Sequence, residues 1–135
     1  MEYTILIIDD NVGDILLMRH ALSKNGKDIR CESALTGAEG LAMLLETDRL
    51  PDLVLLDINM PGMSGIEVLR RIRSEARLLI LPVIIVTHSS LDSDRIESYH
   101  SGASGYLQKS ADLNEFILDI KKILDYYKGN ATQPQ

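Results

Sequence analysis

Short apolar runs alternate with amphipathic stretches along the whole chain. Five runs rich in β-branched and other apolar residues predict strands at residues 4–8, 30–34, 53–56, 82–86 and 105–107. The first, third and fourth runs are the most apolar, which is typical of strands buried on both faces in the middle of a sheet. The second and fifth runs are weaker strand signals.

Helix-start signals lie between these runs. A Thr, Ser or Asp followed three residues later by Glu, the spacing of a capping box, occurs at Thr36, Ser64 and Asp112. The last helix has the clearest amphipathic pattern. Its apolar face consists of Leu113, Phe116, Ile117, Ile120, Ile123, Leu124 and Tyr127. Strict alternation of strand and helix predicts a doubly wound α/β domain, with a five-stranded parallel sheet, five helices and right-handed crossovers.

Length and charge narrow the function classes. The 135 residues suit one domain, expected over residues 1–128, and the stretch GNATQPQ at 129–135 predicts a flexible tail. The 14 Lys and Arg against 20 Asp and Glu give a net charge of −6, which argues against a general nucleic-acid-binding surface. No apolar run approaches the ~20 residues of a membrane span. Together with the lone Cys31, these features predict a cytoplasmic protein without nucleic-acid or membrane partners.

The strand ends carry the candidate chemistry. In an open parallel sheet, ligands bind just outside the carboxyl ends of the strands. Asp9 and Asp10 end the first predicted strand, Asp57 ends the third, Thr87 follows the fourth and Lys109 lies near the end of the fifth. Each alone has an ordinary explanation as a helix cap, a strand-end residue or a solvated charge. Jointly, complementary groups from four strand ends favour a functional site.

Three carboxylates in one pocket require a neutralising partner. Two like charges 4 Å apart repel by about 4 kcal/mol at an effective dielectric of 20. Carboxylate oxygens suit Mg²⁺ or Mn²⁺ rather than zinc, and the three histidines have no recognised metal-ligand spacing. A metal, the ammonium of Lys109 and the hydroxyl of Thr87 would together surround a phosphoryl group on a carboxylate. Asp57, on the central strand, is the expected acceptor, with Asp9 and Asp10 as metal ligands, directly or through water.

Four stretches together resemble a known family. ILIIDDNVGD, LVLLDINMPGMSGIEVL, PVIIVTHSS and SGASGYLQK closely resemble the CheY-like receiver domain of two-component response regulators, and the resemblance covers about residues 4–127. It implies a flavodoxin-like fold with strand order 2-1-3-4-5. It also implies that Asp57 accepts a phosphoryl group from a sensor histidine kinase, and that self-phosphorylation and autodephosphorylation are the only reactions catalysed.

The same resemblance implies further residue roles. Mg²⁺, or Mn²⁺ in its place, would be bound by Asp10, Asp57 and the backbone carbonyl of Asn59, with Asp9 assisting. Thr87 and Tyr106 would form a switch that changes the face made by the fourth helix, the last strand and the fifth helix. Tyr106 is equally compatible with an ordinary half-buried aromatic on an edge strand.

Partner-level expectations follow from weaker features. No effector domain is expected, so any output requires docking onto a protein target that the sequence does not identify. NVGDILLMRHAL and DYYKG resemble stand-alone regulators paired with phytochrome-type kinases. The aromatic end of the last helix is compatible with a homodimer, but Tyr126 and Tyr127 are equally compatible with ordinary packing.

Two positions depart from the family pattern and are expected to modulate the site. Ser110 stands where a proline usually follows the lysine, which predicts a trans or strained bond and makes the position of Lys109 less certain. His88 stands where a small residue usually follows the threonine, and we predict an altered dephosphorylation rate in His88→Ala. A solvent-facing histidine without influence is the alternative.

Three other function classes fit less well. A receiver-like binding module that is never phosphorylated should lose some of the acids, the hydroxyl or the lysine, and this chain has all of them. A flavin-binding domain would have a phosphate-binding loop where Asp9 and Asp10 stand. An aspartate-nucleophile phosphatase would have a second acid at Asn59.

Overall fold

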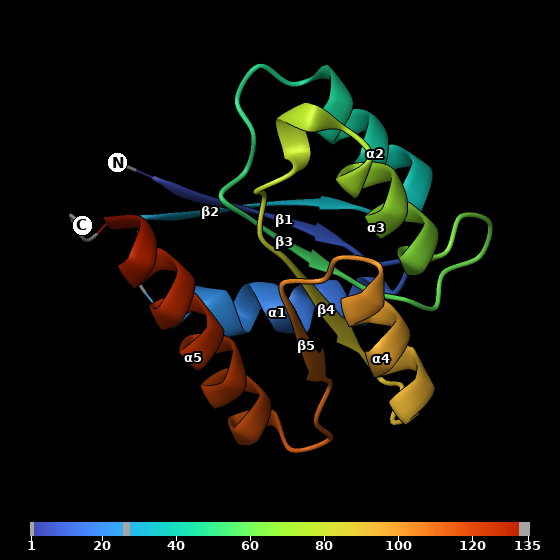
Figure 1. The fold of residues 1–135 in the computed structure, drawn as a ribbon. Coiled ribbons are helices and arrows are strands. Elements are labelled where there is room, and N and C mark those ends of the chain that lie inside the picture. The colour runs from blue at the N-terminus through green and yellow to red at the C-terminus, as the bar shows by residue number, and fades with distance from the viewer. Residues whose placement is uncertain (1, 26–27, 133–135) are drawn as a thin grey trace.

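One parallel sheet forms the centre of the molecule, with helices on both faces (Figure 1). The computed structural model describes residues 2–25 and 28–132. The strand order is β2-β1-β3-β4-β5, which confirms the predicted flavodoxin-like topology. The strands are β1 (Tyr3–Ile8), β2 (Ile29–Ala34), β3 (Leu53–Leu56), β4 (Val83–Thr87) and β5 (Gly105–Gln108). The three most apolar runs are the three central strands, as their burial on both faces requires.

In the part of the chain that the structure describes, five α-helices follow the five strands in turn. They are α1 (Val12–Ser23), α2 (Gly37–Glu46), α3 (Gly65–Arg73), α4 (Asp92–His100) and α5 (Leu113–Thr132). The predicted caps are confirmed: the side chains of Thr36, Ser64 and Asp112 each accept a hydrogen bond from the backbone N–H three residues on. A short 3₁₀ helix, η1 (Ala76–Leu78), lies between α3 and β4 and was not predicted.

Alternate side chains of the strands form two separate cores. Leu6 and Ile8 of β1 face a core shared with α2 and α3, whereas Ile5 and Ile7 face a core shared with α1 and α5. This alternation is the two-residue period of a strand with both faces covered. Figure 1 shows α1 and α5 on one side of the sheet and α2 and α3 on the other.

The carboxyl-terminal helix is longer than expected. The helix α5 continues to Thr132 and so includes residues 129–132 of the stretch 129–135 that is predicted as a tail, whose flexibility stays a prediction. A single glycine costs about 1 kcal/mol in a helix, too little to end one that is already nucleated and packed. Residues 133–135 lie outside the described residues. No helix of the described chain combines the length and the apolar character needed to cross a bilayer.

Candidate functional site

The strand ends bring the predicted acids side by side. The backbone N–H of Asp57 donates to Ile8 O at 3.0 Å, which continues the pairing of β3 with β1 by one residue. Asp57 and Asp9 therefore follow neighbouring strands of the sheet. On the other side, the N–H of Lys109 donates to Thr87 O at 2.7 Å, which continues the pairing of β5 with β4. The parallel register thus brings all four residues to one edge.

Three carboxylates converge at this edge. Asp9, Asp10 and Asp57 each have an oxygen within 4.8 Å of the others. Asp9 and Asp57 are buried and Asp10 is exposed, so the cluster is open to solvent on one side. Asp10 and Asp57 line a cavity of about 240 Å³, together with Asn11, Asp14, Asn59, Thr87 and His88.

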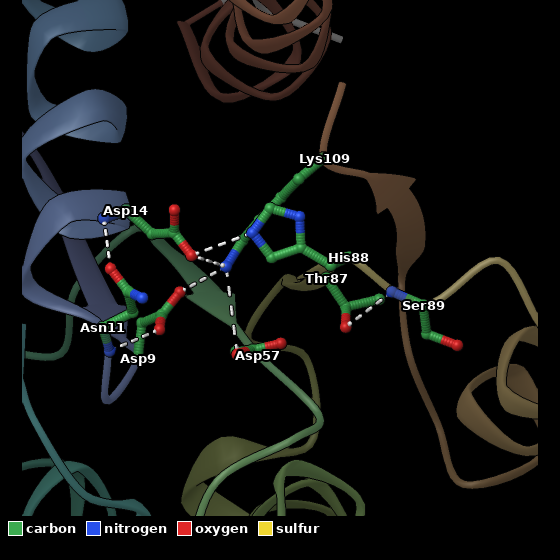
Figure 2. Close-up of polar contacts among 8 residues, drawn as sticks. All are labelled: Asp9, Asn11, Asp14, Asp57, Thr87, His88, Ser89 and Lys109. Atoms are coloured by element: carbon green, nitrogen blue, oxygen red, sulfur yellow. Dashed lines mark hydrogen bonds and ion pairs between the residues drawn. The ribbon is translucent and has the colours of Figure 1, made fainter. Parts of the chain in front are cut away.

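Lys109 is the cation of this site (Figure 2). Its Nζ donates to Asp9 Oδ2 at 2.7 Å and to Asp14 Oδ2 at 2.9 Å, and lies 3.8 Å from Asp57 Oδ2. Burial disfavours the ammonium, but the two hydrogen bonds and the charges of Asp57 and Asp9 outweigh it and raise the pKa of Lys109. Lys109 therefore carries a full positive charge at neutral pH.

The surroundings of Asp57 disfavour its ionised carboxylate. Burial raises the pKa of Asp57, because it disfavours the charged form. The positive charge of Lys109 acts in the opposite direction, but the negative charge of Asp9 partly cancels it. Its Oδ1 is buried and has no hydrogen-bond partner within the described chain. A buried acceptor without a partner is costly and calls for an explanation. An atom or group that binds this oxygen would provide it.

The residues fit a hard divalent cation. Asp9, Asp10 and Asp57 supply carboxylate oxygens, the exposed Asn59 lies in the cavity wall, and among the described residues the cluster of candidate ligands contains no sulfur or imidazole. Oxygen donors of this kind select Mg²⁺ or Mn²⁺. The unpartnered Oδ1 of Asp57 leaves one oxygen of that carboxylate free for further chemistry.

The predicted switch residues meet at the backbone of Ser89. Thr87 is fully buried, and its Oγ1 accepts a hydrogen bond from the N–H of Ser89 at 3.3 Å. The hydroxyl of Tyr106 donates to Ser89 O at 3.2 Å, and partial burial raises the pKa of this hydroxyl. The segment after β4 therefore contacts both residues, although they lie on different strands.

The backbone around the site is close-packed. A Cβ on Gly65, at the start of α3, would collide with the carbonyl oxygen of Asp57. Glycine at this position therefore allows the first turn of α3 to pack against the backbone of Asp57. Gly62, which follows Pro61 in the loop between β3 and α3, has φ +76°, a conformation that favours glycine. The described residues contain no cis peptide bond, so the trans prediction for Lys109–Ser110 is confirmed, and Lys109 still reaches the acids.

Asp14 is the residue that the sequence reasoning missed. It lies in the first turn of α1, where its N–H donates to the N-cap Asn11 Oδ1 at 2.9 Å. Its Oδ2 contacts both Lys109 and, at 3.1 Å, the Nε2 of His88. An acid at the third position of a helix is normally explained by the helix dipole, so the sequence pattern gave no reason to assign Asp14 to the site.

Sequence and structure comparisons agree on the family. The chain matches the response regulator receiver domain family over residues 5–121. It is 33% identical over 120 residues to protein PilH of Pseudomonas aeruginosa, covering 89% of this chain and 96% of PilH. The phosphorylated cyanobacterial phytochrome response regulator RcpA superposes with a TM-score of 0.91, 31% identity and full coverage of both chains.

A second solved structure has the same fold with a metal. The Mn²⁺-bound form of response regulator Rcp1 superposes with a TM-score of 0.86 at 28% identity, covering 98% of this chain and 99% of Rcp1. The topology, the acid cluster and these matches lead to one conclusion. The chain belongs to the receiver domain family of two-component response regulators.

Proposed function

We propose that Asp57 accepts a phosphoryl group from the phosphohistidine of a sensor histidine kinase, and that the domain signals by the resulting change in conformation. One observation carries the proposal. Asp57 Oδ1 is a buried carboxylate oxygen without a hydrogen-bond partner among the described residues, and it lies at the same edge of the sheet as the buried Lys109 and Thr87. A nucleophile in this position needs no general base, because a carboxylate has no proton to lose.

The transfer is a single displacement at phosphorus. Asp57 Oδ1 forms the new P–O bond while the P–N bond to the donor imidazole breaks, and the imidazole keeps that electron pair and takes up a proton. Negative charge on the phosphoryl oxygens is met by the Lys109 ammonium, whose Nζ already lies 3.8 Å from Asp57 Oδ2. The Thr87 hydroxyl, whose hydrogen bonding opposes the rise in the pKa of Asp57, would donate to a phosphoryl oxygen.

Mg²⁺, or Mn²⁺ in its place, is the cofactor that these acids would hold. Asp10, Asp57 and the Asn59 backbone carbonyl are its proposed ligands, with buried Asp9 binding directly or through water. When bound, the cation neutralises charge on the transferring group. The role of Asp9 is also electrostatic, because it keeps Lys109 in the site through the 2.7 Å contact.

Hydrolysis resets the domain. Water attacks phosphorus, the P–O bond to Asp57 breaks, and inorganic phosphate leaves with the carboxylate restored. We therefore propose that the chain is not an enzyme acting on a separate substrate. Movement of Thr87 toward the phosphoryl group would pull on Ser89, whose carbonyl holds the Tyr106 hydroxyl, and so reach the surface of α4, β5 and α5.

The partner assignments belong to the same proposal. Similarity to RcpA, a phytochrome response regulator, supports a phytochrome-type kinase as the donor in the cytoplasm. Tyr126 is 63% exposed on α5 and packs edge-on against Tyr127, with ring centroids 4.9 Å apart. An exposed aromatic on this helix supports a homodimer, or docking of the downstream protein target.

Intact mass after incubation with acetyl phosphate tests the phosphoacceptor. We expect one added phosphoryl group in the presence of Mg²⁺, and none with chelator or in Asp57→Asn. Asp52→Asn is the matched control, because Asp52 lies at the opposite end of β3, where its carboxylate accepts a hydrogen bond from the Thr4 N–H. If the wild-type protein takes up no phosphoryl group while a known receiver domain does so in parallel, the alternative hypothesis of a binding module that is never phosphorylated is favoured.

A further inference from the structure

Lys109 is bound to acids other than the proposed acceptor. Its two short contacts, at 2.7 and 2.9 Å, are with Asp9 and Asp14, whereas Asp57 Oδ2 is 3.8 Å away and beyond hydrogen-bond distance (Figure 2). An ammonium has three protons, and Asp9 and Asp14 accept two of them. In this conformation, the cation that should stabilise the phosphoryl group is engaged elsewhere.

Asp14 differs from the acids at the same position of other helices. Glu39, Glu67 and Glu115 are also the third residue after an N-cap, and each donates its N–H to the cap side chain as Asp14 does. Among these four acids of the described chain, only Asp14 forms an ion pair. The helix dipole explains all four positions, but it does not explain the contact with Lys109.

The position of Asp14 is constrained from several sides. Asn11 caps α1 through the Asp14 N–H at 2.9 Å, and Asn11 is itself anchored by its own N–H to Asp9 Oδ1 at 2.9 Å. His88 contacts the same Asp14 oxygen as Lys109, from the end of β4. Although partial burial alone would raise it, the contacts with Lys109 and His88 lower the pKa of Asp14, so the group is a carboxylate at neutral pH.

We propose that Asp14 is a positioning residue that withholds Lys109 from Asp57, and thereby limits how readily Asp57 accepts a phosphoryl group. The inference rests on the proposed function. Transfer to Asp57 places phosphoryl oxygens that compete with Asp14 for the same ammonium protons. Asp14 also adds a fourth negative charge to a pocket that must receive an anion. Lys109 must leave Asp14, while its contact with Asp9 can remain.

Removing the charge of Asp14 tests this competition. In Asp14→Asn, we expect the rate of phosphorylation by acetyl phosphate to rise at least about threefold, the usual scale of coupling within one salt-bridge network. Asp14→Glu keeps the carboxylate and should stay closer to the wild-type rate. Glu67→Gln is the matched control, because it removes one negative charge from the same position of α3 without touching Lys109, and its rate should be unchanged.

A second measurement follows Lys109 directly in metal-free protein. The ¹⁵N resonance of the Lys109 Nζ should shift in Asp14→Asn and stay in place in Glu67→Gln, which a role in helix stability alone would not produce. An unchanged or slower phosphorylation rate in Asp14→Asn, with wild-type protein phosphorylated normally, would overturn this inference alone. An unmoved Nζ resonance would also overturn it. Failure of the wild-type protein to accept a phosphoryl group would overturn the proposed function and this inference together.

Discussion

The two ends of the sheet use polar residues in opposite ways. At the amino end, Thr4 N–H donates to Asp52 Oδ2 at 2.8 Å, and Val83 N–H donates to Ser104 Oγ at 3.0 Å. Each polar side chain there satisfies a backbone group that the first residues of a strand leave unpaired. At the carboxyl end, three carboxylates lie together and Asp57 Oδ1 has no partner among the described residues.

The contrast between the two ends of the sheet distinguishes polar residues that stabilise the fold from those that are available for a reaction. Buried polar atoms without partners lower stability, so a fold tolerates them where a ligand or reaction uses them. The amino end has the features of a structural edge, and the carboxyl end has those of a reactive edge. Substitutions at the two ends should therefore change different measurements.

Metal binding should give the largest difference between the ends. At a Mg²⁺ concentration about 100 times the Kd, we expect the free energy of unfolding of wild-type protein to rise by about 2.7 kcal/mol, because only the folded state brings the acids together. Asp57→Asn should lose most of this gain, and Asp52→Asn should keep it. Denaturant unfolding with and without Mg²⁺ measures both. Equal stabilisation of the three proteins would place the metal elsewhere.

The reverse separation is expected at the amino end. Ser104→Ala removes the acceptor of the buried Val83 N–H, which should lower the free energy of unfolding by about 1–2 kcal/mol. Phosphorylation by acetyl phosphate should be unaffected, and Ser104→Thr should restore stability by keeping the hydroxyl. A slower phosphorylation in Ser104→Ala would break the distinction between the two ends.

Asp57→Asn should stabilise the metal-free protein. The pKa of Asp57 is raised by burial, so the folded state disfavours its ionised form, and we expect a gain of about 1 kcal/mol at pH 7. As the pH falls through this raised pKa, the folded wild-type protein takes up the proton before the unfolded chain does. The advantage of Asp57→Asn should therefore shrink at acidic pH. Urea unfolding in chelator from pH 4 to 8 checks the sign, and an advantage that grows at low pH would contradict it.

His88→Ala should have the smallest effect. The imidazole is 68% exposed, and its polar contact with the site is with Asp14 Oδ2 at 3.1 Å. We expect its removal to change the dephosphorylation rate about twofold, the scale of a weak exposed contact. Decay of the phosphorylated protein, followed by intact mass, measures it. His100→Ala, on α4, is the control, and an identical decay in wild-type and His88→Ala proteins would leave His88 as a solvent-facing residue without influence.

Much of the site could be predicted because it depends on strand ends. Asp9, Asp57, Thr87 and Lys109 each follow an apolar run, and parallel strands bring such positions to one edge whatever the details of packing. Asp14 could not be found in this way. It lies in a helix, at a position with an ordinary explanation, and the Lys109 that binds it is 95 residues away in the chain.

The pattern of residues was enough to predict the parallel α/β class, the helix caps and the edge at which the acids gather, because these depend on periodicity and on local hydrogen bonding, whereas the strand order came from the family resemblance. The length of α5, which continues to Thr132, and the pairing of Lys109 with Asp9 and Asp14 in preference to Asp57 could be found only from the folded structure. The choice among three carboxylates depends on differences of about 1 Å in side-chain position. Such differences arise from how helices and strands pack on one another, which no local pattern in the chain encodes.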